Sequence, residues 1–84
     1  MIIFTKHAQD KFTILRKHKF IISKEKVLET LNNPDLIDYS RLPLLIAQRK
    51  FDTMYVLRVV YKDEGMNMKV ITFYPGRSKK YGKK

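Results

Sequence analysis

Two side chains capable of proton transfer, His7 and Lys11, lie four residues apart near the start of the chain. Histidine acts as a general acid or base because its reference pKa of about 6.5 lies close to neutral pH. Lysine takes the same role where its surroundings lower its pKa. Residues i and i+4 share one face of a helix, so the two are a candidate catalytic pair, although an exposed surface histidine is the commoner outcome. His18 lies between two lysines, where simple exposure is the plainer interpretation.

Arg77 is the strongest single candidate for a phosphate-binding residue. Its planar guanidinium donates two parallel hydrogen bonds to an oxyanion. It closely follows an apolar run, residues 68–74, that predicts a buried strand, with Pro75-Gly76 expected to stop that strand. A strand of this kind would fix the position of the Arg77 side chain. We therefore interpret Arg77 as a phosphate clamp at the end of the last strand.

Arg49 and Arg58 are predicted on two adjacent strands, where each side chain must point to one face of a sheet. Arg49 is assigned, with Arg77, to the catalytic set as a second phosphate clamp. Arg58 is assigned to nucleic-acid binding. The alternative for Arg58 is an exposed sheet face or an ion pair with Asp38 or Glu29.

The net charge of +10 is concentrated at the two ends of the chain. Residues 1–24 hold six Lys/Arg and one acid, which gives +5. Residues 25–64 hold six Lys/Arg and seven acids, which gives −1, and residues 65–84 hold six Lys/Arg and no acid, which gives +6. If the fold brings the two ends together, they form one basic surface that attracts nucleic acid through phosphate contacts and counterion release.

A broader set of side chains is expected to contact nucleic acid without individual catalytic roles. Cations attract phosphates, and an aromatic ring stacks on a base. The set comprises Arg16, Lys17, Arg58, Lys79, Lys80 and Tyr81. Two interpretations of Tyr81 stay open: base stacking or proton transfer on the one hand, and an unstructured tail residue on the other. Residues 78–84 predict a flexible basic tail, in which Lys83 and Lys84 attract phosphate without a fixed position.

Length and composition predict one small globular domain over residues 1–84. The chain contains no cysteine, which excludes a disulfide framework and Cys-based metal sites. No glycine-rich phosphate loop, HExxH motif or nucleophile motif is present, so neither a metal nor a cofactor is expected. The N-terminus lacks the pattern of a signal peptide, and no apolar run reaches the length of a membrane span. A cytoplasmic protein without membrane contact is expected.

The hydrophobic pattern predicts an α+β domain, with two N-terminal helices packed on a three- to four-stranded antiparallel sheet. The first helix covers residues 6–17 after an N-cap at Thr5, and the second begins after Ser23 and ends at residues 32–35. Residues 2–4 are either a short strand or an apolar lead-in. Strands are predicted over residues 36–39, 44–51, 53–61 and 68–74, with a last hairpin that places Val59 near Val70 and Tyr55 near Tyr74.

This layout resembles the RelE/ParE-like superfamily of small bacterial toxins, and most closely the BrnT-like proteins and related small proteins of unknown function. Three stretches carry the resemblance. They are Thr5-Lys6-His7-Ala8-Gln9-Asp10-Lys11-Phe12, Val27-Leu28-Glu29-Thr30-Leu31-Asn32-Asn33-Pro34-Asp35 and Val70-Ile71-Thr72-Phe73-Tyr74-Pro75-Gly76-Arg77. These correspond to a His-Ala near the first helix, a helix ending in Asn-Pro, and a strand that runs into basic residues.

The resemblance implies a metal-independent endoribonuclease that cleaves mRNA, often on the ribosome, and is silenced by an acidic antitoxin protein. Such cleavage needs a base, an acid and cations for the phosphate, which on this chain would be His7 and Lys11 for proton transfer and Arg49 and Arg77 for the phosphate. Fold does not imply activity. Two alternatives are a non-catalytic RNA- or DNA-binding module and a small subunit that binds an acidic protein partner.

Overall fold

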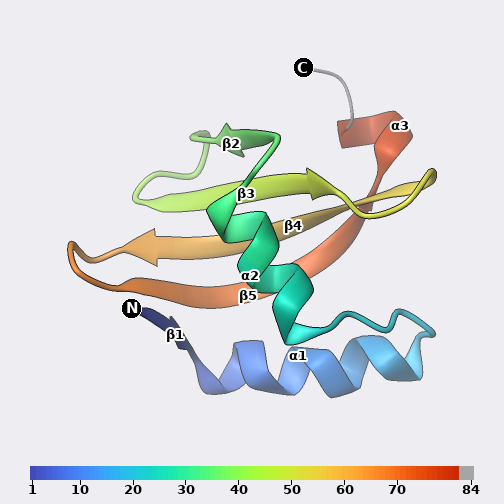
Figure 1. Cartoon of the computed structure of the whole chain (residues 1–84), viewed down its shortest axis with the longest axis horizontal. Coiled ribbons are helices and arrows are strands. Elements are labelled where there is room, and N and C mark those ends of the chain that lie inside the picture. Colours follow the sequence, from blue (N-terminus) through green and yellow to red (C-terminus); the bar gives the residue numbers. More distant parts are fainter. Residues whose placement is uncertain (82–84) are drawn as a thin grey trace.

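A computed structural model of the chain describes residues 1–81, which form one mixed five-stranded sheet with two helices on one face (Figure 1). The elements, in chain order, are β1 (Ile2–Phe4), α1 (Lys6–Lys17), α2 (Lys24–Asn32), β2 (Leu36–Asp38), β3 (Leu44–Lys50), β4 (Tyr55–Asp63), β5 (Met68–Arg77) and α3 (Ser78–Tyr81). The strand order across the sheet is β1-β5-β4-β3-β2. The predicted α+β class with two N-terminal helices on a sheet is confirmed.

The sheet differs from the prediction in strand number and direction. It has five strands rather than three or four, and β1 pairs with β5 in parallel, with Ile2 opposite Met68 and Phe4 opposite Val70. The other neighbouring strands are antiparallel, as predicted. Three consecutive apolar residues do not show the alternation of apolar and polar side chains that indicates a strand. The partner of β1 also lies far away in the sequence. The local pattern therefore contained no signal for this pairing.

Both helices begin at the caps that the sequence predicts. The hydroxyl of Thr5 accepts the backbone N–H of Ala8 at 3.1 Å, and the hydroxyl of Ser23 accepts that of Lys26 at 3.1 Å. Each cap satisfies a backbone donor that the first helical turn leaves unpaired. Helix α1 ends at a chain reversal in which Lys19 adopts φ of 68°.

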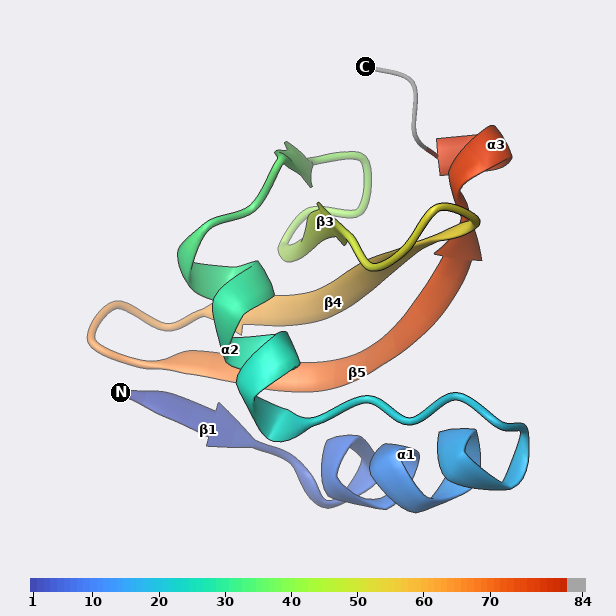
Figure 2. The same cartoon turned by 45° about the vertical axis from the view of Figure 1, so that its right-hand side comes forward.

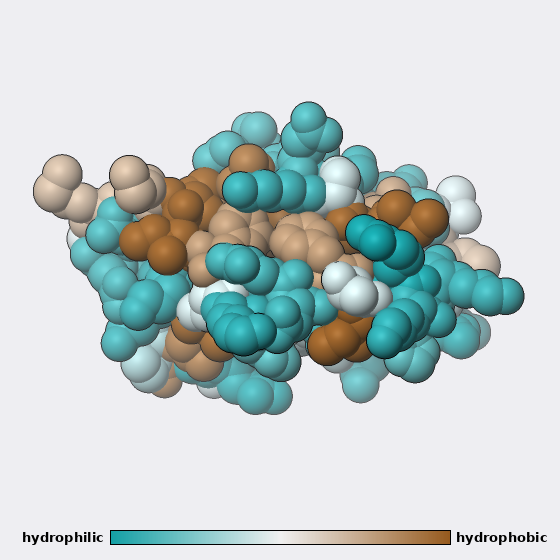
Figure 3. Space-filling model, turned by 90° about the horizontal axis from the view of Figure 1, so that it is seen from below, coloured by the Kyte–Doolittle hydropathy of each residue, from teal (hydrophilic) through white to brown (hydrophobic). Residues whose placement is uncertain are grey.

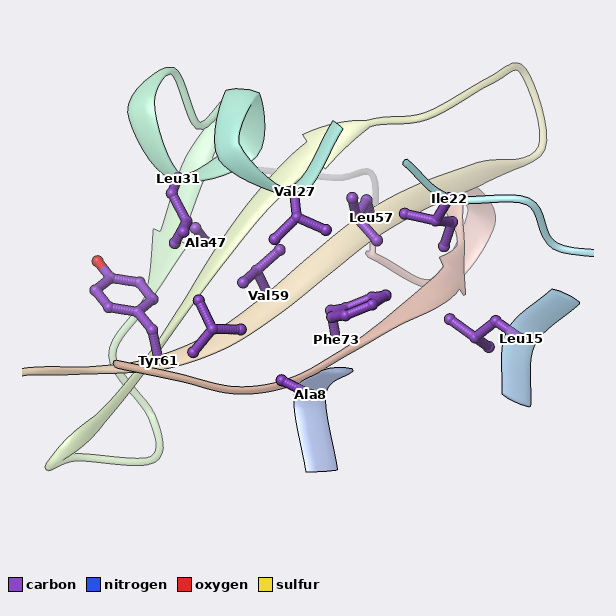
Figure 4. Packing of buried hydrophobic residues seen from close by; sticks show 11 residues of the cluster. Ala8, Leu15, Ile22, Val27, Leu31, Ala47, Leu57, Val59, Tyr61 and Phe73 are labelled. Carbon is purple, nitrogen blue, oxygen red and sulfur yellow. The ribbon is translucent and has the colours of Figure 1, made fainter. Parts of the chain in front are cut away.

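The hydrophobic core lies between the two helices and one face of the sheet (Figure 4). Phe73 is fully buried at its centre, and its ring centroid lies 4.6 Å from that of Phe12 on α1. Leu57 and Val59 of β4 point to the same face and are 1% and 0% exposed. Val27 of α2 covers them from above, as Figure 4 shows. The apolar stripes on both helices are therefore the parts of the sequence that build the core.

The β4–β5 register differs from the predicted hairpin by three residues. Tyr55 lies opposite Arg77 rather than Tyr74, and Val59 lies opposite Phe73 rather than Val70. The ladder pair nearest the turn is Asp63 with Met68, so the turn is longer than the Asp63-Glu64-Gly65 signal predicts. The longer turn shifts the register by two residues. An irregularity between Val60 and Tyr61 shifts the register by the third residue. A bulge of this kind inserts one extra residue into one strand.

Strand β5 continues through Pro75 and Gly76, where the sequence predicts that it stops. Strand β1 pairs only with residues 68–70, so within residues 1–81 the outer edge of β5 has no neighbouring strand at Pro75. Proline lacks a backbone N–H and is tolerated at such an edge. The extension carries the chain to α3, which projects beyond the end of β5 (Figure 2).

Candidate nucleic-acid interface

The C-terminal end of α1 and the C-terminal end of β5 lie at the same end of the sheet. The ring of Phe20, just beyond α1, packs edge-on against that of Tyr55, with 4.9 Å between centroids. Tyr55 lies directly opposite Arg77 in the β4–β5 ladder. Figures 1 and 2 both show the end of α1, the β3–β4 turn and α3 on the right-hand side. The end of α1 and the β5–α3 segment therefore lie at the same end of the sheet, with α1 on one face and α3 on the other.

We call this region the basic end and define it by six exposed cationic residues. They are Arg16, Lys17, Lys19, Arg77, Lys79 and Lys80. None of the six forms an ion pair with an acid within residues 1–81. The acid of the adjacent β3–β4 turn, Asp52, accepts the backbone N–H groups of Met54 and Tyr55, both at 2.8 Å. Viewed from the α1 side, hydrophilic side chains project at the same right-hand end (Figure 3).

A buried polar cluster on the other face of the sheet holds α3 in place. We call it the Arg58 cluster, after the residue at its centre, which is 5% exposed. Arg58 donates from Nε to the Tyr74 hydroxyl at 3.0 Å, from Nη2 to Asp38 Oδ2 at 2.9 Å, and from Nη1 to Gln48 Oε1. Gln48 Nε2 in turn donates to the carbonyl of Tyr81 at 2.7 Å. The ring of Tyr81 lies 4.2 Å from the guanidinium carbon.

The Arg58–Asp38 pair is ionised over the ordinary pH range. Hydrogen bonds from the side chain and backbone of Ser40, followed by the bond from Arg58, lower the pKa of Asp38 to about 2. Burial lowers the pKa of Arg58, but hydrogen bonds and charge interactions with Tyr74 and Asp38 outweigh it, so that the net shift is upward. The guanidinium is therefore a permanent cation, and each of its three nitrogens donates a hydrogen bond within the cluster. This supports the ion-pair interpretation of Arg58 and gives no support to direct contact with RNA.

The first four residues of the predicted flexible tail, residues 78–81, are helical. Residues 78–81 form α3, and its last residue, Tyr81, is packed against Arg58 rather than free to stack on a base. The Tyr81 ring also leaves no room for a side chain at Gly76, where an added Cβ would lie 2.5 Å from ring atom Cδ2. Lys83 and Lys84 lie outside the described residues. Lys79 and Lys80 therefore have fixed positions at the basic end.

Arg49 lies on the helix-covered face and ties β3 to the end of α2. Its Nη1 donates to the carbonyl of Asn33 at 2.7 Å. Its Nη2 lies 3.4 Å from Glu29 Oε2, and its Nη1 lies 3.8 Å from Asp35 Oδ1. Strand alternation places Arg49 on the opposite face from Arg58, because Gln48 and not Arg49 is the partner of Arg58 in the ladder. This environment gives Arg49 a structural role between helix and sheet.

His7 and Lys11 lie in the first half of α1, a helix that starts at the end of the sheet away from Arg77. The backbone N–H of Thr5, just before His7, bonds the carbonyl of Val70 at 3.1 Å, near the start of β5. Arg77 is at the other end of that strand, about 23 Å further along at about 3.3 Å per residue. The structure does not bring the four predicted catalytic residues into one cleft. His18, given less weight from sequence, is the histidine that lies exposed at the basic end.

Gln48 and Tyr74 are the structural residues that the sequence reasoning missed. A glutamine between Ala47 and Arg49 in an otherwise apolar strand is a weak signal for a buried polar partner on the face opposite the core. Tyr74 alternates with Phe73 and so belongs to the same face as Arg58, its ladder partner. The contacts of Gln48 and Tyr74 with Arg58 could be predicted only with the correct registers of the β3–β4 and β4–β5 ladders.

Within residues 1–81, no three His, Asp or Glu side chains are grouped so as to hold a metal ion. In that same part of the chain, no helix combines the length and apolar character needed to cross a membrane. Comparisons with family models, curated proteins and solved structures found no match to this chain.

Proposed function

We propose that this protein binds single-stranded RNA, and that the basic end contacts the phosphate backbone. One observation carries the proposal: two basic segments that are distant in the sequence flank the same end of the sheet, α1 on one face and α3 on the other, and their cations have no ion-pair partner among residues 1–81. Six cations held on helix ends and a strand end offer a run of phosphate contacts. A cytoplasmic location is part of the proposal because RNA is the partner.

A single strand is favoured over duplex DNA by the shape of the basic end. Reading the major groove requires a helix or a two-stranded ribbon that projects into it. Helix α1 buries Ala8 and Leu15 against the sheet and so lies flat, and α3 has only four residues. Neither element is available to enter a groove. Backbone contacts along a flexible strand suit such a surface, and the resemblance to RNA-cleaving toxins favours RNA over single-stranded DNA.

The test is the salt dependence of binding to a fluorescein-labelled single-stranded RNA, measured by anisotropy. Lys79→Ala/Lys80→Ala and Arg16→Ala/Lys17→Ala should each weaken binding and lower the slope of log K against log salt by about 1.4, which is two contacts at about 0.7 each. The matched control is Lys6→Ala/Lys62→Ala, which removes the same charge from the other end. Equal weakening by control and basic-end variants would overturn the proposal.

A metal-independent endoribonuclease is the second candidate, and one observation favours it. His18 is exposed among the phosphate-binding cations of the basic end. Incubation of labelled RNA with the protein in EDTA tests this function. Cleavage that is lost in His18→Gln but kept in His7→Gln would establish it, whereas a shifted band without cleavage products leaves the binding function alone. Affinity for an acidic protein that persists in the presence of excess RNA would instead favour the protein-partner alternative.

A further inference from the structure

A surface pocket of about 520 Å³ opens on the face of the sheet opposite α1 and α2. Its lining comes from four separate parts of the fold: the start of β2, the end of β3, the β3–β4 turn with the start of β4, and the start of α3. The lining residues are Asp35, Leu36, Gln48, Lys50, Thr53, Val56 and Ser78. The pocket adjoins the basic end because Ser78 lies between Arg77 and Lys79.

The pocket combines an apolar surface with polar side chains at its edge. Leu36 and the buried Val56 supply aliphatic surface, against which a flat ring packs. The hydroxyl oxygen of Ser78 is buried and has no hydrogen-bond partner within residues 1–81. Lys50 adds an exposed cation at the rim.

Asp35 supplies a carboxylate held in a defined orientation. Its Oδ2 accepts the backbone N–H of Lys50 at 2.9 Å, and its Oδ1 lies 3.8 Å from Arg49 Nη1. A carboxylate has about four lone-pair sites, so both oxygens can accept further donors. A ligand that matches this group presents two adjacent N–H donors.

We infer that the pocket binds one unpaired guanine base of the RNA, with Asp35 accepting the donors of its Watson–Crick edge. The inference rests on the proposed RNA-binding function and adds base selectivity to it. Guanine is the one common RNA base with two neighbouring N–H donors, N1–H and N2–H₂, on that edge, whereas uracil presents a single N–H between two carbonyls. A volume of about 520 Å³ lies within the range of small-molecule pockets. Lys50 and Lys79 would hold the flanking phosphates.

The first experiment compares two labelled RNAs, U₉ and U₄GU₄, by anisotropy at constant salt. Wild-type protein should bind U₄GU₄ about 10-fold more tightly, as expected for one good bidentate base contact. Asp35→Asn should remove this preference while affinity for U₉ and its salt slope stay unchanged. The matched control Asp10→Asn, on the outer face of α1, should keep the preference.

The second experiment separates this inference from the proposed function. GMP and UMP are titrated into ¹⁵N-labelled full-length protein, and amide shifts are followed by NMR. GMP should shift the amides of Thr53, Val56 and Ser78, and UMP should not. Equal binding of U₉ and U₄GU₄ with no GMP-specific shifts overturns the guanine site but leaves RNA binding intact. GMP-specific shifts at the pocket without binding of either RNA would support the site and overturn the proposed function.

Discussion

The two faces of the sheet are covered by different kinds of contact, although they share the same strands. On β4, Leu57 and Val59 point into the apolar core beneath the helices, while Arg58 between them points into a polar cluster beneath α3. Apolar burial is favourable wherever it occurs and is non-directional. A hydrogen-bonded ion pair is directional and requires its partners in set positions. The first face thus holds the domain together, and the second determines where α3 lies.

This difference has an energetic basis. A buried ion pair gains little net stability over apolar residues of the same size, because desolvation offsets the attraction. Removing one partner is costly, because it leaves the other buried and uncompensated. The Arg58 cluster therefore contributes chiefly to the placement of Tyr81, and with it of Lys79 and Lys80 at the basic end. The fold and the candidate interface depend on different residues.

The largest effect is expected on the helix-covered face. Phe73→Ala should lower the free energy of unfolding by about 3–5 kcal/mol, because it deletes a fully buried ring and leaves a cavity against Phe12. Urea denaturation followed by far-UV circular dichroism measures this change. Phe73→Leu, which keeps much of the volume, should cost about 1 kcal/mol. If Phe73→Ala instead freed α3 to protease with global stability unchanged, the division of roles between the two faces would be wrong.

The helix-covered face is also the part of the fold that the sequence predicts best. Ala8, Phe12 and Leu15 follow a helical period, and the caps Thr5 and Ser23 precede apolar stripes, so helix positions were correct. These signals are local and depend on spacing within a few residues. The parallel pairing of β1 was not predicted and the β4–β5 register was wrong, because neither the partner of a three-residue strand nor a bulge can be recognised from local spacing.

The candidate site was less predictable, for a related reason. Spacing along a helix tells which side chains share a face, but not which end of the sheet that face reaches. His7 and Lys11 do share α1, yet Arg77 lies at the other end of β5. The charge distribution located the two basic segments in the sequence, but it could not tell whether they form one surface, and the structure puts α1 and α3 on opposite faces of the sheet. The choice of Asp38 as partner of Arg58 was one of two alternatives left open.

The next largest effect is expected at the centre of the polar face. Arg58→Met keeps the side-chain volume but deprives Asp38 and Gln48 of their donors. It should lower the free energy of unfolding by about 2–3 kcal/mol, below the range for a fully buried pair because the Asp38 side chain is 28% exposed. It should also release α3 from the sheet. The rate of limited trypsin cleavage after Arg77 measures this release directly. An unchanged cleavage rate would contradict the anchoring role.

Gly76→Ala is the companion variant, because it disturbs the docking of Tyr81 without removing a charge. The added Cβ would meet the Tyr81 ring at 2.5 Å from Cδ2 and 2.7 Å from Cε2, so the ring must move. Cleavage after Arg77 should again be faster, with a loss of about 1–2 kcal/mol in the free energy of unfolding. Faster cleavage in both variants would show that α3 depends on the cluster, and not on the charge of Arg58 alone.

The smallest effect is the pH dependence that distinguishes the polar face from the apolar one. The pKa of Asp38 is about 2 in the folded protein, below its ordinary value of 3.8, so its ionised form stabilises the fold above pH 4. That contribution, about 1 kcal/mol after allowance for partial exposure, is lost as pH falls from about 4 to about 2. Urea denaturation of wild type and Asp38→Asn across this range isolates it from the other acids. Wild type should be the more stable by about 1 kcal/mol at pH 5, with the two converging near pH 2. A difference that stays constant with pH would mean that the charge of Asp38 does not stabilise the polar face.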